Sequence, residues 1–212
     1  LITVMHANNE VGTVQSVAEI AGIASARGIV IHTDAAQSIG KIPVDVRDLG
    51  VDLLSIAGHK LYASKGIGVL YVRDGVVLEK FMHGAGHEGG RRAGTEDVLE
   101  IVGLGKACEI IERCLEDHAD HLRTMRDRLE KDLVDQLSEV QVNGHRENRL
   151  PNTLSVSFKG VNADDVMDQI GDEVAASAGA ACHSGEVSVS HVLSAMKMPM
   201  EWARGTVRLS VG

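Results

Sequence analysis

The feature that most constrains the fold is a strand, helix, strand pattern in the first 33 residues. Residues 1–6 form an apolar run, and a polar loop with turn residues follows at 7–12. Apolar side chains then recur at the spacing of one helix face, after the candidate cap Ser16 and before the candidate C-terminal glycine Gly28: Val17, Ile20, Ala21 and Ala24. Residues 29–33 are a continuous run rich in β-branched residues, which is typical of a parallel strand covered on both faces. The pattern predicts a βαβ unit.

The rest of the chain divides into two regions of different pattern. The first continues with predicted strands at 52–56 and 67–72, a glycine-rich segment at 83–94 and a helix over 95–140. The second has a predicted half-buried strand at 154–158, a helix from 162 or 163 to 170, a short helix at 190–198 and a strand at 207–211. We therefore expect a mainly parallel α/β domain over residues 1–140 and a smaller α+β domain over residues 141–212.

Composition excludes several classes of function. The net charge is −9 and aromatic residues make up 2% of the 212 residues, so the chain lacks the positive charge and the stacking groups of a nucleic-acid binder. No apolar run reaches the roughly 18 to 20 residues of a membrane span. Three scattered cysteines do not make a disulfide framework, and we expect a reducing, cytoplasmic location. Because both ends look cut from a longer protein, an organellar location stays open.

No metal site is predicted. His83 and His87 have the spacing H-x-x-x-H, which binds metal on a helix, but they lie in the glycine-rich segment. Cys108 and Cys114 fall on the pattern of the long helix and are expected to be inert packing residues.

Polar residues follow three of the predicted strands. They are Asn8 and Asn9 after the first strand, Asp34 and Gln37 after the second, and His59 and Lys60 after the third. Each alone is most often a turn, a cap or a solvated side chain. Because the carboxyl ends of parallel strands meet at one edge of a sheet, where ligands bind, we expect these residues to gather there.

An acid, a lysine and amides at one edge suit a pyridoxal phosphate site. The amine of Lys60 would form a Schiff base with the cofactor, and the carboxylate of Asp34 would pair with the pyridine nitrogen. The apolar flanks of Lys60, residues 56–58 and Leu61, argue against an ordinary surface lysine.

Longer segments resemble a known family, the class V, fold-type I pyridoxal phosphate enzymes, and within it the cysteine desulfurases and selenocysteine lyases. The segments are MHANNEVGTVQ, HTDAAQSIGKIPVD, DLLSIAGHKLYASKGIGVLYVR, RRAGTEDVLEIVGLGKA, LPNTLSVSF, SAGAACHSG and RLSVG. They cover essentially the whole chain in the family's order. The resemblance implies a fold-type I large domain, incomplete at its amino terminus, with a small C-terminal domain.

The resemblance implies the following cofactor contacts. Lys60 matches the lysine that forms the Schiff base, Asp34 matches the acid at the pyridine nitrogen, and Gln37 matches the amide that contacts the ring hydroxyl. Asn9 matches a further cofactor-contacting asparagine, and His59 matches the histidine on the phosphate side. Thr95 matches the threonine that reaches the phosphate of a neighbouring subunit. The role of Thr95 implies a homodimer with shared sites.

The resemblance also implies a reaction. Arg208 matches the arginine that binds the substrate carboxylate, and Asn152 a substrate-side asparagine. Cys182 matches the catalytic cysteine that takes sulfur from L-cysteine as a persulfide while L-alanine leaves. With L-selenocysteine, selenide is released. A sulfur- or selenium-acceptor protein is an expected partner.

The sequence departs from the family in three places. Ala57 stands where desulfurases often carry a phosphate-binding serine, and His183 after the cysteine is nearer the selenocysteine lyases. The family's amino-terminal portion is absent, so the chain alone is expected to bind cofactor poorly and to be inactive. Cys182 is expected in a mobile loop, where the neighbouring imidazole can favour its thiolate.

Three other interpretations stay open. The first is an aminotransferase of the same fold, which should tolerate Cys182→Ala. The second is an inactive truncated homologue that serves as a dimerisation or binding module. The third is a sulfur-carrier domain without cofactor, against which Lys60 and Asp34 argue.

Overall fold

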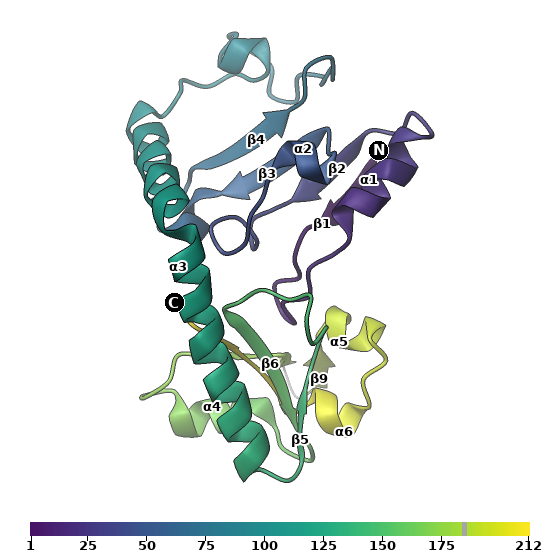
Figure 1. Cartoon of the computed structure of the whole chain (residues 1–212), viewed down its shortest axis with the longest axis vertical. Helices are drawn as coiled ribbons and strands as arrows, with labels where there is room; N and C mark the ends of the chain where they lie inside the picture. Colours follow the sequence, from purple (N-terminus) through teal and green to yellow (C-terminus); the bar gives the residue numbers. More distant parts are fainter. Residues whose placement is uncertain (184–185) are drawn as a thin grey trace. The chain divides into compact units, whose positions relative to one another are not determined.

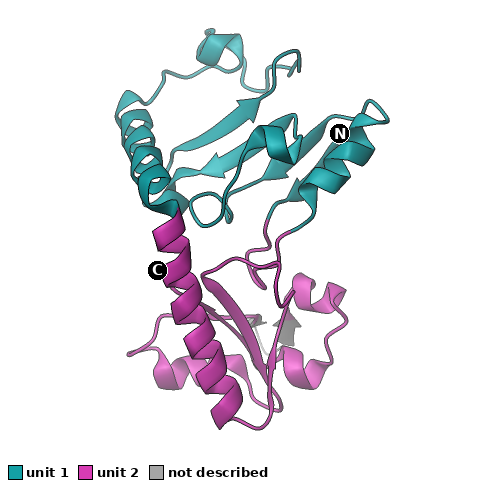
Figure 2. Cartoon of the chain, viewed as in Figure 1, with its two compact units in different colours: residues 1–6, 15–115 teal, residues 7–14, 116–212 magenta. Residues whose placement is uncertain are grey.

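The computed structural model describes residues 1–183 and 186–212, without the side chains of residues 180–188. The chain forms two compact units: residues 1–6 with 15–115, and residues 7–14 with 116–212 (Figure 2). No helix in the described part of the chain is both long enough and apolar enough to cross a membrane.

The first unit is built on a mixed four-stranded sheet. Its strands are β1 (Ile2–Met5), β2 (Ile31–Asp34), β3 (Leu53–Ala57) and β4 (Gly68–Val72), in that order (Figure 1). β1, β2 and β3 are parallel, whereas β4 runs antiparallel to β3. Helix α1 (Val17–Ser25) connects β1 to β2, which confirms the predicted βαβ unit and a mainly parallel sheet.

The two faces of this sheet differ in polarity. One face packs on α1, and its core residues are Val17, Ala21, Ala24, Ile31 and Leu54. On the other face, the ring of His32 bridges Thr3 (Nδ1 to Oγ1, 2.6 Å) and Ser55 (Nε2 to Oγ, 3.2 Å). The apolar face therefore forms the core, and a row of polar side chains lies on the other face.

The short helix α2 (Val46–Leu49) begins after Asp45, whose carboxylate accepts a hydrogen bond from the Arg47 amide.

The long helix α3 (Val98–Gln136) has 39 residues and begins three residues later than predicted. The Asp97 carboxylate accepts a hydrogen bond from the Glu100 amide at its start. The compact units divide inside this helix, after Leu115; the boundary is predicted inside or just after the helix, near residue 140. The reason is that its second half packs on the second unit. Cys108, expected to pack, is exposed.

The second unit contains a four-stranded antiparallel sheet and a separate hairpin. The sheet has the order β5 (Val140–Val142), β6 (Thr153–Phe158), β10 (Thr206–Ser210) and β7 (Ser177–Ala178), and the hairpin pairs β8 (Ala180–His183) with β9 (Glu186–Val189). The helices are α4 (Ala163–Ile170), α5 (His191–Ala195) and α6 (Met200–Ala203) (Figure 1). The smaller antiparallel sheet agrees with the predicted α+β part.

The core of the second unit corrects one expectation. Val142, Leu154 and Val156 are buried against the side chains of Leu129 and Leu133 of α3. Strand β6 was predicted to be half-buried, but both of its faces are covered. Its serines tolerate burial because they are hydrogen-bonded: the Asn143 amide nitrogen lies 3.1 and 2.8 Å from the hydroxyls of Ser155 and Ser157.

Candidate active site

In the first unit, two adjacent strand ends present predicted site residues. Asp34 is the last residue of β2 and pairs in register with Ser55 of the parallel strand β3. Its side chain is exposed, and one carboxylate oxygen accepts a hydrogen bond from the Ala36 amide at 2.8 Å. This turn fixes the carboxylate at the edge of the sheet where parallel strands end.

Lys60 and His59 lie in the 3₁₀ turn η1 (Gly58–Leu61), which directly follows β3. Both side chains are exposed. The turn is tight: the Gly58 amide donates to the Ile67 carbonyl at 2.9 Å, and a Cβ on Gly58 would lie 2.7 Å from the Ile67 side chain. A glycine is therefore required to place Lys60.

Gln37 lies in the turn after β2, together with a lysine that the sequence reading missed. The ammonium of Lys41 donates to the Gln37 carbonyl at 3.1 Å. Burial, and then the positive charge of Lys60, lower the pKa of Lys41 to about 8. The two amines are therefore close enough to repel each other. The available signal was a lysine within an otherwise apolar stretch, between Ile39 and Ile42.

Thr95 is exposed in the segment between η2 (Glu88–Gly90) and α3. The guanidinium of Arg92 shapes this segment, because it donates to the Gly94 carbonyl at 2.6 Å and pairs with the Glu88 carboxylate at 3.1 Å. The preceding loop is thus ordered by its own charged residues.

In the second unit, the structure brings together Asn9 and Arg208, which are 199 positions apart in the chain. One guanidinium nitrogen of Arg208 donates to the Asn9 carbonyl at 2.9 Å, and another to the Ser177 hydroxyl at 3.1 Å. The third nitrogen, Nε, is buried without a partner. Because a buried guanidinium nitrogen is normally hydrogen-bonded, Arg208 retains capacity to bind an anion.

Arg208 lines a pocket of about 710 Å³ within this unit. Other residues around it include Glu10, Ser155, Ser177, Gly179, Val189 and Ser190. Gly179 precedes β8, Val189 ends β9 and Ser190 follows it, so the pocket reaches the base of the hairpin.

The backbone of Cys182 lies in β8, paired with Val187 of β9. The predicted loop is therefore wrong for the backbones of these residues, which pair as strands, whereas the predicted mobility stays a prediction. The side chains of Cys182 and His183 lie outside the described part of the structure. Among the described residues, no group of three histidine, cysteine or acidic side chains could hold a metal ion.

Asn152 is buried beside the last strand. Its amide nitrogen donates to the Val211 carbonyl at 3.4 Å, and its amide oxygen accepts from the Thr153 hydroxyl at 3.1 Å. In this structure the side chain thus contacts the chain itself, and its predicted role toward substrate stays a prediction.

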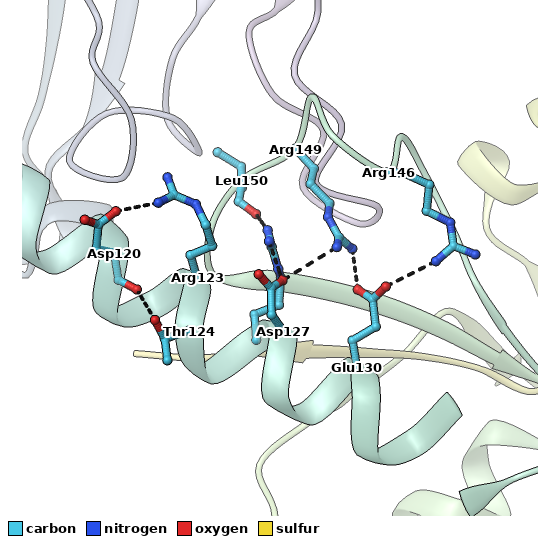
Figure 3. A network of polar contacts seen from close by, with 9 residues as sticks. Asp120, Arg123, Thr124, Asp127, Glu130, Arg146, Arg149 and Leu150 are labelled. Carbon is cyan, nitrogen blue, oxygen red and sulfur yellow. Dashed lines mark hydrogen bonds and ion pairs between the residues drawn. The ribbon is translucent and has the colours of Figure 1, made fainter. Parts of the chain in front are cut away.

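A polar network supports the loop that carries Asn9 (Figure 3). From α3, Arg126 donates to the Leu150 carbonyl at 2.7 Å, and Glu130 pairs with Arg149 at 2.6 Å. The Leu150 amide in turn donates to the Gly12 carbonyl at 2.8 Å. The segment 7–14 is therefore held through residues 148–150 by the second half of α3.

The residues of the first unit fit pyridoxal phosphate by their chemistry. An exposed carboxylate (Asp34), an exposed amine (Lys60) and an amide (Gln37) stand at the ends of adjacent parallel strands. These groups can bind a pyridine nitrogen, an aldehyde and a ring hydroxyl, respectively.

Comparison with known proteins relates the chain to proteins named cysteine desulfurase. The chain is 43% identical to a cysteine desulfurase IscS of Dictyoglomus turgidum, covering all of this chain and 54% of that protein. A NifS-like protein from Rickettsia africae has a similar structure, with a TM-score of 0.90 and 28% identity over 99% of this chain and 56% of the other. A further NifS-like protein gives a TM-score of 0.89 and 35% identity over 99% and 55%.

The chain spans about half the length of the curated relatives it matches. Residues 1–212 match the family model described as aminotransferase class-V, from end to end. The match, together with the βαβ sheet and the lysine turn after β3, leads to one conclusion: this chain belongs to the aminotransferase class-V family.

Proposed function

We propose that the protein containing this chain uses pyridoxal phosphate to remove sulfur from L-cysteine, or selenium from L-selenocysteine, and yields L-alanine. Relatives named cysteine desulfurase support this proposal at 43 and 45% identity. The observation that carries it is the pocket in which Arg208 and the base of the Cys182 hairpin lie together. The pocket can bind the substrate carboxylate close to the strand that carries a thiol.

In the proposed reaction, the bound cofactor supplies an electron sink for the substrate α-carbon. Lys60 holds the cofactor and then moves the α-proton, while Asp34 keeps the ring nitrogen protonated. Gln37, His59 and Asn9 contact the cofactor. Lys60 is suited to both tasks because its exposed amine follows β3 directly, in the turn after the strand.

In the second unit, the guanidinium of Arg208 binds the substrate carboxylate, and Asn152 is proposed as a further substrate contact. The thiolate of Cys182 attacks the substrate sulfur: an S–S bond forms, the C–S bond breaks, and the electron pair stays with the carbon fragment that becomes alanine. A reducing acceptor then collects the sulfur from Cys182. With selenocysteine, selenide is released to its acceptor.

We also propose that two copies of the protein associate through the first unit, so that Thr95 of each reaches the phosphate of the other. The support is the exposure of large apolar side chains in the chain segments before and after Thr95. Phe81 is 93% exposed and Leu99 is 80% exposed, which is unusual for large apolar side chains on a free surface. Light scattering of the full-length protein should give the mass of a dimer, and a monomer would contradict this arrangement.

The function is tested with the full-length protein after borohydride reduction, by peptide mass spectrometry. A pyridoxyl-phosphate adduct on Lys60 is expected, and an unmodified Lys60 would favour the binding-module interpretation. Sulfide and alanine release from L-cysteine, and selenide release from L-selenocysteine, are then compared in wild type and Cys182→Ala. Loss of sulfur transfer in the variant supports the proposal. Full activity of the variant in amino-group transfer would favour an aminotransferase.

A further inference from the structure

The carboxylate of Glu10 makes a contact that none of the proposed catalytic roles uses. It accepts a hydrogen bond from the hydroxyl of Ser190, 180 positions away in the chain. Both residues line the Arg208 pocket. A hydrogen bond to an ionised acceptor is about twice as strong as one between neutral groups, so this contact can fix the position of its partner.

Ser190 stands at the base of the Cys182 hairpin. Its amide donates to the Gly179 carbonyl at 3.2 Å, which closes the segment 180–189 at its two ends. Its hydroxyl also accepts from the Val192 amide at 3.0 Å and caps α5. Gly179 in turn donates to the Thr206 carbonyl at 2.7 Å. One end of the hairpin base is therefore attached to β10, the strand that carries Arg208.

Gly179 allows this attachment because it has no side chain. A Cβ at this position would lie 2.8 Å from the Thr206 methyl group and 3.0 Å from its Cβ. The Gly179 end is thus fixed by backbone contact alone. The Ser190 end has a side-chain contact in addition to its backbone hydrogen bond to Gly179, and the carboxylate of Glu10 provides it.

The loop that carries Glu10 is itself rigidly shaped. The side-chain oxygen of Asn8 accepts hydrogen bonds from the amides of Glu10 and Val11, both at 2.9 Å. The next residue, Asn9, receives the guanidinium of Arg208 on its carbonyl. Two consecutive residues of one loop therefore contact Arg208 and the hairpin base, respectively.

We propose that Glu10 is a positioning residue: through Ser190 it sets the base of the Cys182 hairpin relative to Arg208. The inference rests on the proposed function of Cys182 and Arg208. Glu10 acts through Ser190 and not by contact with substrate. Without the carboxylate, substrate binding by Arg208 should persist, whereas the thiol-dependent step should slow.

The test compares Glu10→Ala with the wild-type full-length holoenzyme. Hydrogen–deuterium exchange in peptides covering residues 180–190 is expected to speed up by about ten-fold, while peptides from β6 stay unchanged. The KM for L-cysteine should stay within about two-fold, and kcat for sulfur release should fall by about five-fold or more. Glu10→Gln keeps an acceptor oxygen. Its exchange at residues 180–190 and its kcat should therefore lie between those of Glu10→Ala and the wild type.

The matched control is Glu139→Ala, which removes an exposed carboxylate of the same unit that pairs with Lys159. It should change neither exchange nor kcat. Unchanged exchange at residues 180–190 in Glu10→Ala overturns the proposal, as does a raised KM with unchanged kcat, which would mark Glu10 as a substrate contact. Exchange that rises throughout the unit also overturns it. A wild-type protein that is inactive toward cysteine would instead contradict the proposed function. The exchange data would still decide whether Glu10 orders the base of the hairpin.

Discussion

The guanidinium of Arg149 lies 2.6 Å from the carboxylate of Glu130, and only 8% and 17% of the two side chains are exposed. This ion pair joins helix α3 to the segment that precedes Asn152. The backbone of Arg149 forms a bridge with Thr13, which lies in the loop of Asn9 and Glu10. A pair remote from the proposed chemistry thus supports the residues that carry it.

Replacement of Glu130 by alanine should destabilise the protein by about 3 kcal/mol, because it leaves the buried Arg149 charge without this partner. Urea unfolding of the full-length protein measures the loss. The exposed pair of Glu139 and Lys159 serves as the comparison, and Glu139→Ala should cost less than about 1 kcal/mol. Equal losses in the two variants would show that burial of the pair is unimportant.

Arg208→Lys should raise the KM for L-cysteine by about ten-fold or more. Lysine keeps the charge, but it cannot hold Asn9 and Ser177 with two nitrogens while a third group binds a carboxylate. Steady-state kinetics of alanine release provide the measurement. The exposed Arg204, changed to lysine in the same way, should leave KM unchanged. A normal KM in Arg208→Lys would remove this arginine from substrate binding.

Gly58→Ala should shift the turn that places Lys60, because the new methyl group would meet the side chain and carbonyl of Ile67 at 2.7 and 2.9 Å. We expect a loss of about 1 to 3 kcal/mol in stability and weaker borohydride labelling of Lys60. Gly22→Ala, in helix α1 with open space around it, should instead stabilise by about 0.5 to 1 kcal/mol. Similar effects at both glycines would contradict the close approach of Ile67.

Lys41 should make stability rise with pH in the alkaline range. The pKa of Lys41 falls from 10.5 to about 8 on folding, so between these values the unfolded chain binds more protons than the folded one. Raising the pH through this window therefore favours the folded state. Below pH 8 the buried charge costs up to about 3 kcal/mol. Urea unfolding of wild type and Lys41→Met at pH 7 and pH 10 checks the sign: the variant should be more stable at pH 7, and its advantage should shrink at pH 10.

Local sequence pattern was enough to predict the βαβ unit, because continuous apolar runs indicate strands and apolar residues at helical spacing indicate the helix between them. The strand at 67–72 was predicted, but not its antiparallel direction, and the short strands β5, β7, β8 and β9 were not predicted. Their partners are set by tertiary pairing, which short windows do not report. Strand β6 looked half-buried because its serines alternate with apolar residues, and only the structure shows Asn143 satisfying them.

For the site, the order of motifs indicated the family and the topology indicated the sheet edge at Asp34. Sequence could not show that Arg208 contacts the Asn9 carbonyl, since that contact spans almost the whole chain. Lys41 was missed for another reason. Its burial and its repulsion with Lys60 arise from the turn after β2, and its neighbours in sequence are ordinary apolar residues.

The path of the chain between the two units has a consequence for synthesis. Residues 7–14 leave the ribosome more than a hundred residues before their hydrogen-bond partners at 145–150 and at Arg208. The β1–β2 pair can form soon after its residues appear, but the loop bearing Asn9 and Glu10 must wait in the nascent chain. Contacts between residues so far apart in sequence form slowly. The second unit should therefore finish folding only after Arg208 has been translated.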